Sequence, residues 1–168
     1  MSIAETFLPE FDQEMATTRR LLERVPDGNG TWKPHPKSFS LGHLAQLVAR
    51  MPGWLVSMLK QPTLDLSNSP GYSYETTETL LHVFDQNVRD GRAALAATTD
   101  AEFAEQWSLT FGDQVLMSLP RRDVVRQTIN HLVHHRGQLS VYLRMNEVPL
   151  PSIYGPTADE PWGGGQAR

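Results

Sequence analysis

The chain of 168 residues contains no cysteine, which excludes disulfides, thiolate metal ligands, iron–sulfur clusters and a cysteine nucleophile. It also lacks any run of 18 apolar residues, so we expect no membrane-spanning helix. Residues 1–10 have neither a basic start nor an apolar stretch. We therefore expect no signal peptide and a cytoplasmic protein.

Basic residues are fewer than acidic ones, with 15 Lys and Arg against 19 Asp and Glu and a formal net charge of −4. Without a basic surplus, nucleic acid is not expected as the main partner. Hydrophobic residues make up 39% of the chain, which is ordinary for a globular protein. The length predicts one domain over residues 1–168, large enough to bury roughly 70% of its unfolded surface.

Apolar residues recur at intervals of three and four along four long stretches, which is typical of amphipathic helices. These stretches run from Phe7 to Val25, from Leu44 to Leu59, from Leu80 to Leu95 and from Pro120 to Asn146. Ser38 or Ser40 can cap the second helix, and Pro52 inside it predicts a kink or a break. Because each helix has one apolar face, we expect an all-α four-helix bundle.

The connections between these helices carry weaker signals. Residues 61–73 contain two prolines, a glycine and several serines and are expected to form a loop. Thr99 and Glu102 have the spacing of a capping box, which predicts a short extra helical turn. Apolar residues alternate on both sides of Gly112, which indicates a small hairpin before the last helix. Residues 147–168 are expected to form an extended, wrapped or frayed tail, which Ile153 and Tyr154 can clamp onto the bundle.

Three of the six histidines lie within residues 131–135. At 100° per residue, His131 and His135 are about 40° apart on the apolar face of their helix, whereas His134 lies at the edge of that face. We therefore expect His131 and His135 to point into the bundle. Two imidazoles four residues apart can clamp a divalent ion such as Zn²⁺ or Ni²⁺. The alternative is that they hydrogen-bond to each other, to a backbone carbonyl or to water.

Several neighbouring residues have both a functional and a structural interpretation. Arg136 lies at the margin of the apolar face, where it can bind a substrate anion or form a surface salt bridge. Gln138 lies beside the histidines and can hydrogen-bond at the site or be an interior amide. Gly137 costs a helix about 1 kcal/mol, which indicates close packing or a site. Glu14 is a candidate carboxylate near the site, although a charge on a helix face is the preferred interpretation. Trp54 and Trp107 are expected to pack in the core or at an interface.

The motif from His131 to Arg144, which reads HLVHHRGQLSVYLR, closely resembles the signature of the DinB-like (DinB/YfiT) family. Residues 32–38, 40–54 and 146–156 also fit that family. The resemblance implies a DinB-type four-helix bundle, commonly a homodimer, with a divalent ion held by three histidines. Some proteins of this family are metal-dependent transferases that use a low-molecular-weight thiol, others are presumed hydrolases, and many have no established activity.

When the family pattern is carried over residue by residue, His131 and His135 match two of the three metal ligands. The third ligand position, in the second helix, aligns to Leu47, which cannot bind a metal. His43 lies one turn earlier, on the rim of the apolar face, and is the candidate replacement. The site is complete if His43 reaches the ion, and otherwise it is empty or binds the ion weakly.

Two functional hypotheses follow. In the first, His131, His135 and His43 hold a divalent ion between the second and fourth helices. Arg136 and Gln138 then bind the substrate. Because the chain has no cysteine, any thiol must be a co-substrate. In the second, the bundle is not catalytic, its metal site is incomplete, and it binds a small ligand or a partner. Haem between the helices is a third hypothesis that no attachment motif supports.

Overall fold

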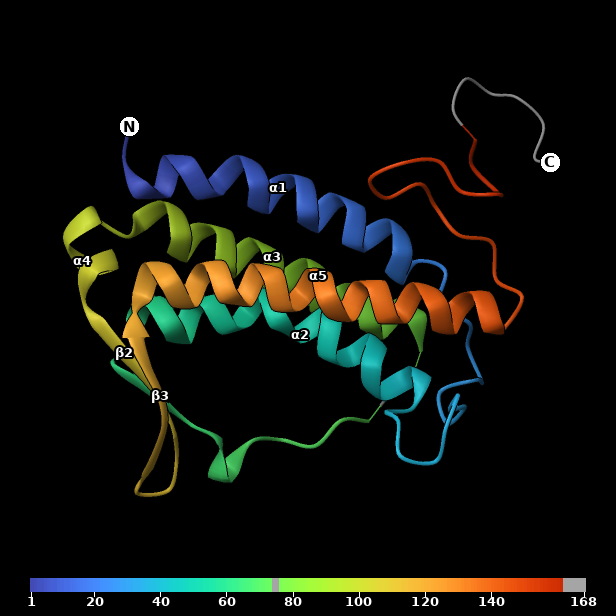
Figure 1. Ribbon diagram of the computed structural model, residues 1–168, viewed down its shortest axis with the longest axis horizontal. Coiled ribbons are helices and arrows are strands. Elements are labelled where there is room, and N and C mark those ends of the chain that lie inside the picture. Colours follow the sequence, from blue (N-terminus) through green and yellow to red (C-terminus); the bar gives the residue numbers. More distant parts are fainter. Residues whose placement is uncertain (74–75, 162–168) are drawn as a thin grey trace.

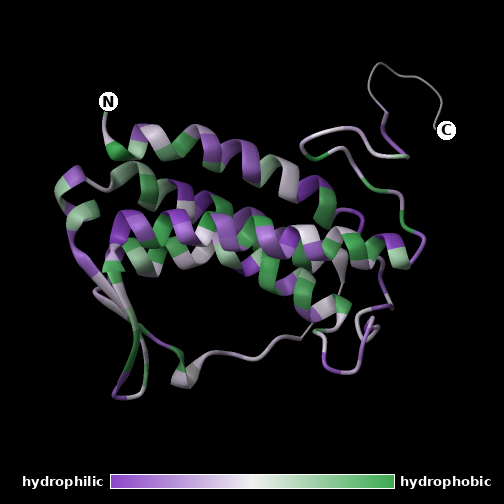
Figure 2. Ribbon diagram, in the orientation of Figure 1, coloured by the Kyte–Doolittle hydropathy of each residue, from purple (hydrophilic) through white to green (hydrophobic). Residues whose placement is uncertain are grey.

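The computed structural model describes residues 1–73 and 76–161. Its four long helices are α1 (Ile3–Leu22), α2 (Leu41–Lys60), α3 (Thr77–Ala97) and α5 (Arg121–Met145). Helix α2 packs against α3 and α5, and α1 packs against the same two helices (Figure 1). Hydrophilic and hydrophobic residues alternate around each long helix (Figure 2). The four helices predicted from the periodicity are therefore confirmed.

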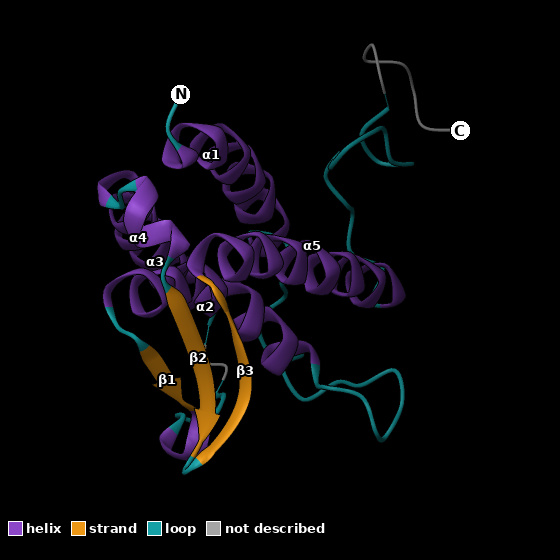
Figure 3. Ribbon diagram, turned by 60° about the vertical axis from the view of Figure 1, so that its left-hand side comes forward, coloured by secondary structure: helices purple, strands orange, loops and turns teal. Residues whose placement is uncertain are grey.

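The fold is mostly helical but not all-α, because a three-stranded sheet lies at one end of the helices (Figure 3). Strands β2 (Gln106–Phe111) and β3 (Gln114–Pro120) are antiparallel and form the predicted hairpin, with Gly112 at a positive φ of 55° in its turn. Strand β1 (Thr63–Asp65) pairs in parallel with β2. The segment expected to be a loop therefore contributes a strand and a short 3₁₀ helix, η1 (Leu66–Asn68).

Two of the predicted helix starts are confirmed by their caps. The side chain of Ser40 accepts a hydrogen bond from the backbone N–H of His43 at 3.3 Å, so Ser40 rather than Ser38 caps α2. The short helix α4 (Asp100–Ala104) begins with a capping box between Thr99 and Glu102.

Helix α2 is continuous through Pro52 but changes direction along its length (Figure 1). Proline donates no hydrogen bond, and its ring strains the helix turn before it. Asn87 of α3 also joins the two helices here, because its Nδ2 donates to the carbonyl of Ala49 at 2.9 Å. A Cβ on Gly91 would lie 2.3 Å from the carbonyl oxygen of Pro52. The bent helix and α3 are thus held in a close contact that requires glycine.

The hydrophobic core lies between the four long helices and extends to α4 and the hairpin. Its largest fully buried apolar side chains come from α1, α2, α3, α4 and β2: Phe11, Leu21, Leu22, Leu41, Leu44, Met51, Leu55, Leu59, Phe84, Phe103 and Trp107. Helix α5 adds smaller ones, among them Val125, Leu139 and Leu143. Within the described residues, no helix combines the length and the apolar character needed to span a bilayer.

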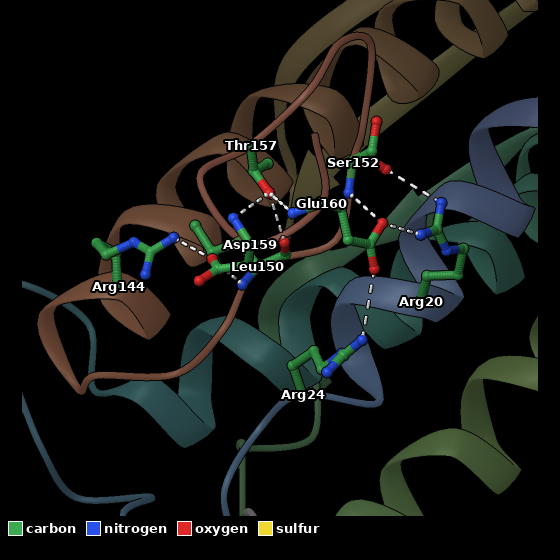
Figure 4. A network of polar contacts seen from close by, with 8 residues as sticks. All are labelled: Arg20, Arg24, Arg144, Leu150, Ser152, Thr157, Asp159 and Glu160. Atoms are coloured by element: carbon green, nitrogen blue, oxygen red, sulfur yellow. Dashed lines mark hydrogen bonds and ion pairs between the residues drawn. The ribbon is translucent and has the colours of Figure 1, made fainter. Parts of the chain in front are cut away.

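The tail after α5 folds back along α1 and α5, as predicted, and two carboxylates attach it (Figure 4). Asp159 pairs with Arg144 of α5, and Glu160 pairs with Arg20 and Arg24 of α1. A hydrogen bond from Arg144 is the main reason why the pKa of Asp159 is lowered. The part of the predicted tail beyond residue 161 lies outside the described residues.

A buried ion pair joins α1 to α5 beneath this tail. The guanidinium of Arg136 is 1% exposed and lies 2.6 Å from the carboxylate of Glu14. It also donates to the hydroxyl of Thr18 at 3.1 Å and to the hydroxyl of Tyr154 at 2.8 Å. Tyr154 in turn donates to Glu14 at 2.9 Å, which confirms that it clamps the tail. The interpretation of Glu14 as a charge on a helix face is wrong, because its carboxylate is buried and paired.

We expect Glu14→Gln to lower the free energy of unfolding by about 3 kcal/mol, because it leaves the charge of Arg136 buried without a counter-charge. Glu10→Gln is the matched control, since Glu10 pairs with Arg126 between the same two helices but is 35% exposed. The control should cost less than about 1 kcal/mol. Urea unfolding of both variants measures the difference, and equal losses would contradict this account of the buried pair.

Candidate functional site

A cavity of about 800 Å³ lies between α2, α5, the sheet and the segment that precedes α3. Its walls take residues from all of these elements and one from α3. They are Arg50, Gly53, Trp54, Ser57 and Met58 of α2; Leu64, Leu66, Ser69, Pro70 and Tyr72 of the segment; Asn87; Trp107, Leu109 and Met117 of the sheet; and Gln127, Thr128 and His131 of α5. This volume is in the range of sites that bind small molecules.

The walls of the cavity are mainly apolar and aromatic, with a few polar groups. Tyr72, Gln127 and His131 are exposed, so the cavity is open to solvent at these residues. Trp107 is fully buried and belongs to the core, as expected, but it also lines the cavity. Trp54 is half-buried and lies against the ring of His131, with 6.1 Å between the centroids. Both tryptophans therefore pack against neighbouring side chains and also line the cavity.

His131 and His135 lie next to each other on α5, as the spacing predicts. Their Nε2 atoms are 2.8 Å apart. His135 is 9% exposed and points inward, whereas His131 is exposed and lines the cavity. The spacing predicts that both histidines point into the bundle: His135 is buried there, and His131 lines the cavity between α2, α5 and the sheet, where it is accessible to solvent.

Gln138 fixes the orientation of His135. Its Oε1 lies 2.7 Å from Nδ1 of His135, so Nδ1 carries the proton and Nε2 presents a lone pair. Burial lowers the pKa of both His131 and His135, and the charges of neighbouring histidines lower it further. Both imidazoles are therefore neutral at pH 7, which is the form that accepts a hydrogen bond or binds a metal ion.

His43 does not join the histidine pair. Its ring stacks between Phe39, at 4.3 Å, and Tyr72, at 4.1 Å, with interplanar angles of 18° and 17°. Leu47, one turn further along α2, is 6% exposed and belongs to the core. Within the described ranges, no group of three or more His, Cys, Asp or Glu side chains is arranged to hold a metal ion.

The donor set fits a divalent cation through two nitrogen ligands only. Two nitrogens about 2.0–2.1 Å from one ion are about 2.9 Å apart at right angles and about 3.3–3.4 Å apart in a tetrahedron. The 2.8 Å between the Nε2 atoms of His131 and His135 is close to the right-angle value. An ion at this pair has no third protein ligand among the residues described, so its other positions are left to solvent or substrate.

Two residues expected near the substrate have other surroundings. The guanidinium of Arg136 is enclosed between α1 and α5 with Glu14 and Thr18 and does not line the cavity. It holds the two helices together and is not available to a substrate anion. Gln138 is exposed and bound to His135, so it positions the imidazole. A Cβ on Gly137 would meet no atom within 4 Å, so close packing does not explain this glycine.

Sequence reasoning missed several polar residues of the cavity wall, among them Arg50 and Asn87. On a helical wheel, Arg50 and Trp54 fall within about 20° of His43, and this stripe on α2 is the signal that was available. Asn87 gives no such signal, because its place depends on the contact between α3 and the bent part of α2.

The lowered pKa values of His131 and His135 predict how stability depends on pH in the presence of a chelator. Unfolded histidine binds a proton below about pH 6.5, whereas the folded pair resists protonation, so stability falls as pH falls through this range. Urea unfolding at pH 7.5 and 5.5 should show a larger loss for the unmodified protein than for His131→Gln with His135→Gln. His82→Gln, on the exposed face of α3, is the control and should behave like the unmodified protein. An unchanged loss in the double variant would contradict the prediction.

Comparisons with known proteins agree with this architecture. The sequence profile of the DinB family matches residues 1–163. The uncharacterized protein YrdA of Bacillus subtilis is 25% identical over 157 residues, which cover 92% of this chain and 89% of YrdA. Two crystal structures share the fold: the DinB-like protein YjoA of Bacillus subtilis, with a TM-score of 0.68 and 19% identity, and a DinB-like protein of Bacillus cereus, with a TM-score of 0.70 and 23% identity. The alignments cover 88% and 89% of this chain and 96% and 97% of the two structures. The chain belongs to the DinB family.

Proposed function

We propose that this chain is an enzyme that binds a small, mainly apolar molecule in the cavity and acts on it with a divalent ion held by His131 and His135. The observation that carries the proposal is the convergence of two neutral imidazoles, with Nε2 atoms 2.8 Å apart, beside a cavity of about 800 Å³. An apolar cavity with few polar groups binds the body of a small molecule, and the polar groups orient it.

In this proposal, His131 and His135 hold the ion, and Gln138 keeps Nε2 of His135 directed toward it. A bound divalent ion such as Ni²⁺ or Zn²⁺ lowers the pKa of a coordinated water or thiol, which provides a nucleophile near neutral pH. Trp54 and the apolar side chains of the sheet limit the access of bulk water to the substrate. Since the chain has no cysteine, a thiol would be a second substrate, and the reaction would be a thiol transfer or a hydrolysis.

A second candidate function is the binding of a small ligand without catalysis. Leu47, which is buried at the position where the family resemblance implies a third ligand, favours it. In this case His131 and His135 hydrogen-bond to each other, and the cavity alone carries the function. The two candidates share the cavity and differ in the ion.

Metal binding separates the two candidates. Untagged protein should bind about one Ni²⁺ or Zn²⁺ per chain in isothermal titration calorimetry, and His131→Ala should weaken binding at least about tenfold because one of two ligands is lost. His82→Ala removes a histidine from outside the site and should leave binding unchanged. Unmodified protein that binds neither ion would overturn the enzyme proposal in favour of the second candidate.

Occupation of the cavity is tested with phenylnaphthylamine, an uncharged aromatic probe whose fluorescence increases in apolar surroundings. Ser57→Trp places a large side chain in the cavity and should reduce probe binding at least about tenfold. Val141→Trp adds the same side chain at an exposed position of α5 that does not line the cavity, and it should bind the probe as the unmodified protein does. If the unmodified protein fails to bind the probe, or if both variants bind it equally, the cavity is not the binding site.

A further inference from the structure

Among the described residues, Arg50 is one of only two arginines without a carboxylate partner. Nine of the eleven arginines in residues 1–73 and 76–161 lie within 4.0 Å of a carboxylate oxygen. The two exceptions are Arg50 and Arg89, and of these Arg50 lines the cavity. Within residues 1–73 and 76–161, its positive charge therefore has no counter-charge at the wall of the cavity.

The guanidinium of Arg50 is held in place by neutral groups. Its Nη1 donates to the carbonyl of Gly71 at 2.9 Å and also lies 3.5 Å from the carbonyl of Pro70. Its Cζ lies 4.8 Å from the centre of the Tyr72 ring. These contacts use one nitrogen and one face of the guanidinium. Nε and Nη2 have no partner in the described part of the chain, and an arginine fork of this kind suits a planar oxyanion.

The rest of the cavity wall disfavours a cation and accepts an apolar group. Among the described residues, no aspartate or glutamate lines it. Leu64, Leu109 and Met117 supply apolar side chains opposite α2, and Trp54 and Trp107 supply aromatic ones. A positively charged ligand would meet Arg50 without any compensating carboxylate. An apolar ligand with an anionic group at one end would suit both the apolar side chains of the cavity wall and the positive charge of Arg50.

The charge of Arg50 is also felt by its neighbours. Desolvation is the main cause of the lowered pKa of His43, and the positive charges of Arg50 and Lys33 lower it further. Arg50 thus places a positive charge beside residues 70–72, although the whole chain carries a formal net charge of −4. An anion attracted here responds to a local charge and not to the overall charge of the protein.

We propose that the cavity takes an anionic amphipathic ligand, with an apolar body and a terminal oxyanion such as a carboxylate, and that Arg50 binds the oxyanion. This inference rests on the proposed function, because it specifies which class of small molecule the cavity binds. It assigns to Arg50 the recognition of a substrate anion that the sequence suggested for Arg136.

Two probes with the same ring system test the proposal. Anilinonaphthalene sulfonate carries an anionic group, and phenylnaphthylamine is the same molecule without it. Arg50→Gln should weaken binding of the sulfonate about tenfold and change binding of the uncharged probe less than about twofold. Arg50→Lys keeps the charge and should restore part of the affinity for the sulfonate. Ser57→Trp should weaken both probes, which locates them in the cavity.

Arg89→Gln is the matched control, because Arg89 also has no carboxylate partner in the part of the chain that the structure describes, contacts Gln86 and lies outside the cavity wall. It should leave both probes unaffected. If Arg50→Gln weakens both probes equally or neither of them, Arg50 only holds the segment around Tyr72, and the inference is overturned while the cavity remains a binding site. If the unmodified protein does not bind the uncharged probe, the proposed function itself fails.

Discussion

The buried ion pair between Arg136 and Glu14 is the constraint on which the position of the site depends. A buried guanidinium without its carboxylate is destabilising by several kcal/mol, so α5 cannot rotate away from α1 without a large loss of stability. His135 precedes Arg136 and lies about 100° from it around the helix. Pairing on the α1 side therefore turns His131 and His135 toward α2 and the cavity. Tyr154 contacts both charged groups, so the tail protects the same pair from solvent.

The opposite side of the cavity depends on how α2 is bent and covered. Asn87 donates to the carbonyl of Ala49 in the turn before Pro52, and it lines the cavity as well. The segment after α2 is held over this region by Arg50 and by the stack of Tyr72 on His43. Arg50 and His43, two polar residues of α2, thus hold the segment after α2 in place beside the cavity. As a result, the space between α2, α5 and the sheet is enclosed on several sides without being filled by side chains.

Local patterns in the sequence predict most of the fold and part of the site. The helices follow from periodicity, the hairpin from alternation around Gly112, and the histidine pair from the spacing of four residues within one helix. Contacts between distant residues leave no such pattern. Strand β1 has only three residues and pairs with a strand more than 40 positions later, and the pairing of Glu14 with Arg136 joins residues 122 positions apart. The stacking of His43 likewise depends on Tyr72, so the family resemblance, which made His43 the candidate replacement for a third ligand, could not reveal it.

Leu47 explains why the polar groups of the cavity are distributed as they are. A buried leucine at this position supplies no metal ligand from α2. The nitrogen lone pairs that can bind an ion therefore belong to His131 and His135 of α5. Helix α2 contributes the positive charge of Arg50 to the cavity wall instead. A divalent ion at the histidine pair would add positive charge to a wall that has no carboxylate among the described residues. It would strengthen the attraction for an anionic ligand, and by linkage the anion would strengthen the binding of the ion. If the ion binds, one anionic substrate would therefore compensate both for the incomplete set of protein ligands and for Arg50, which has no carboxylate partner among the described residues.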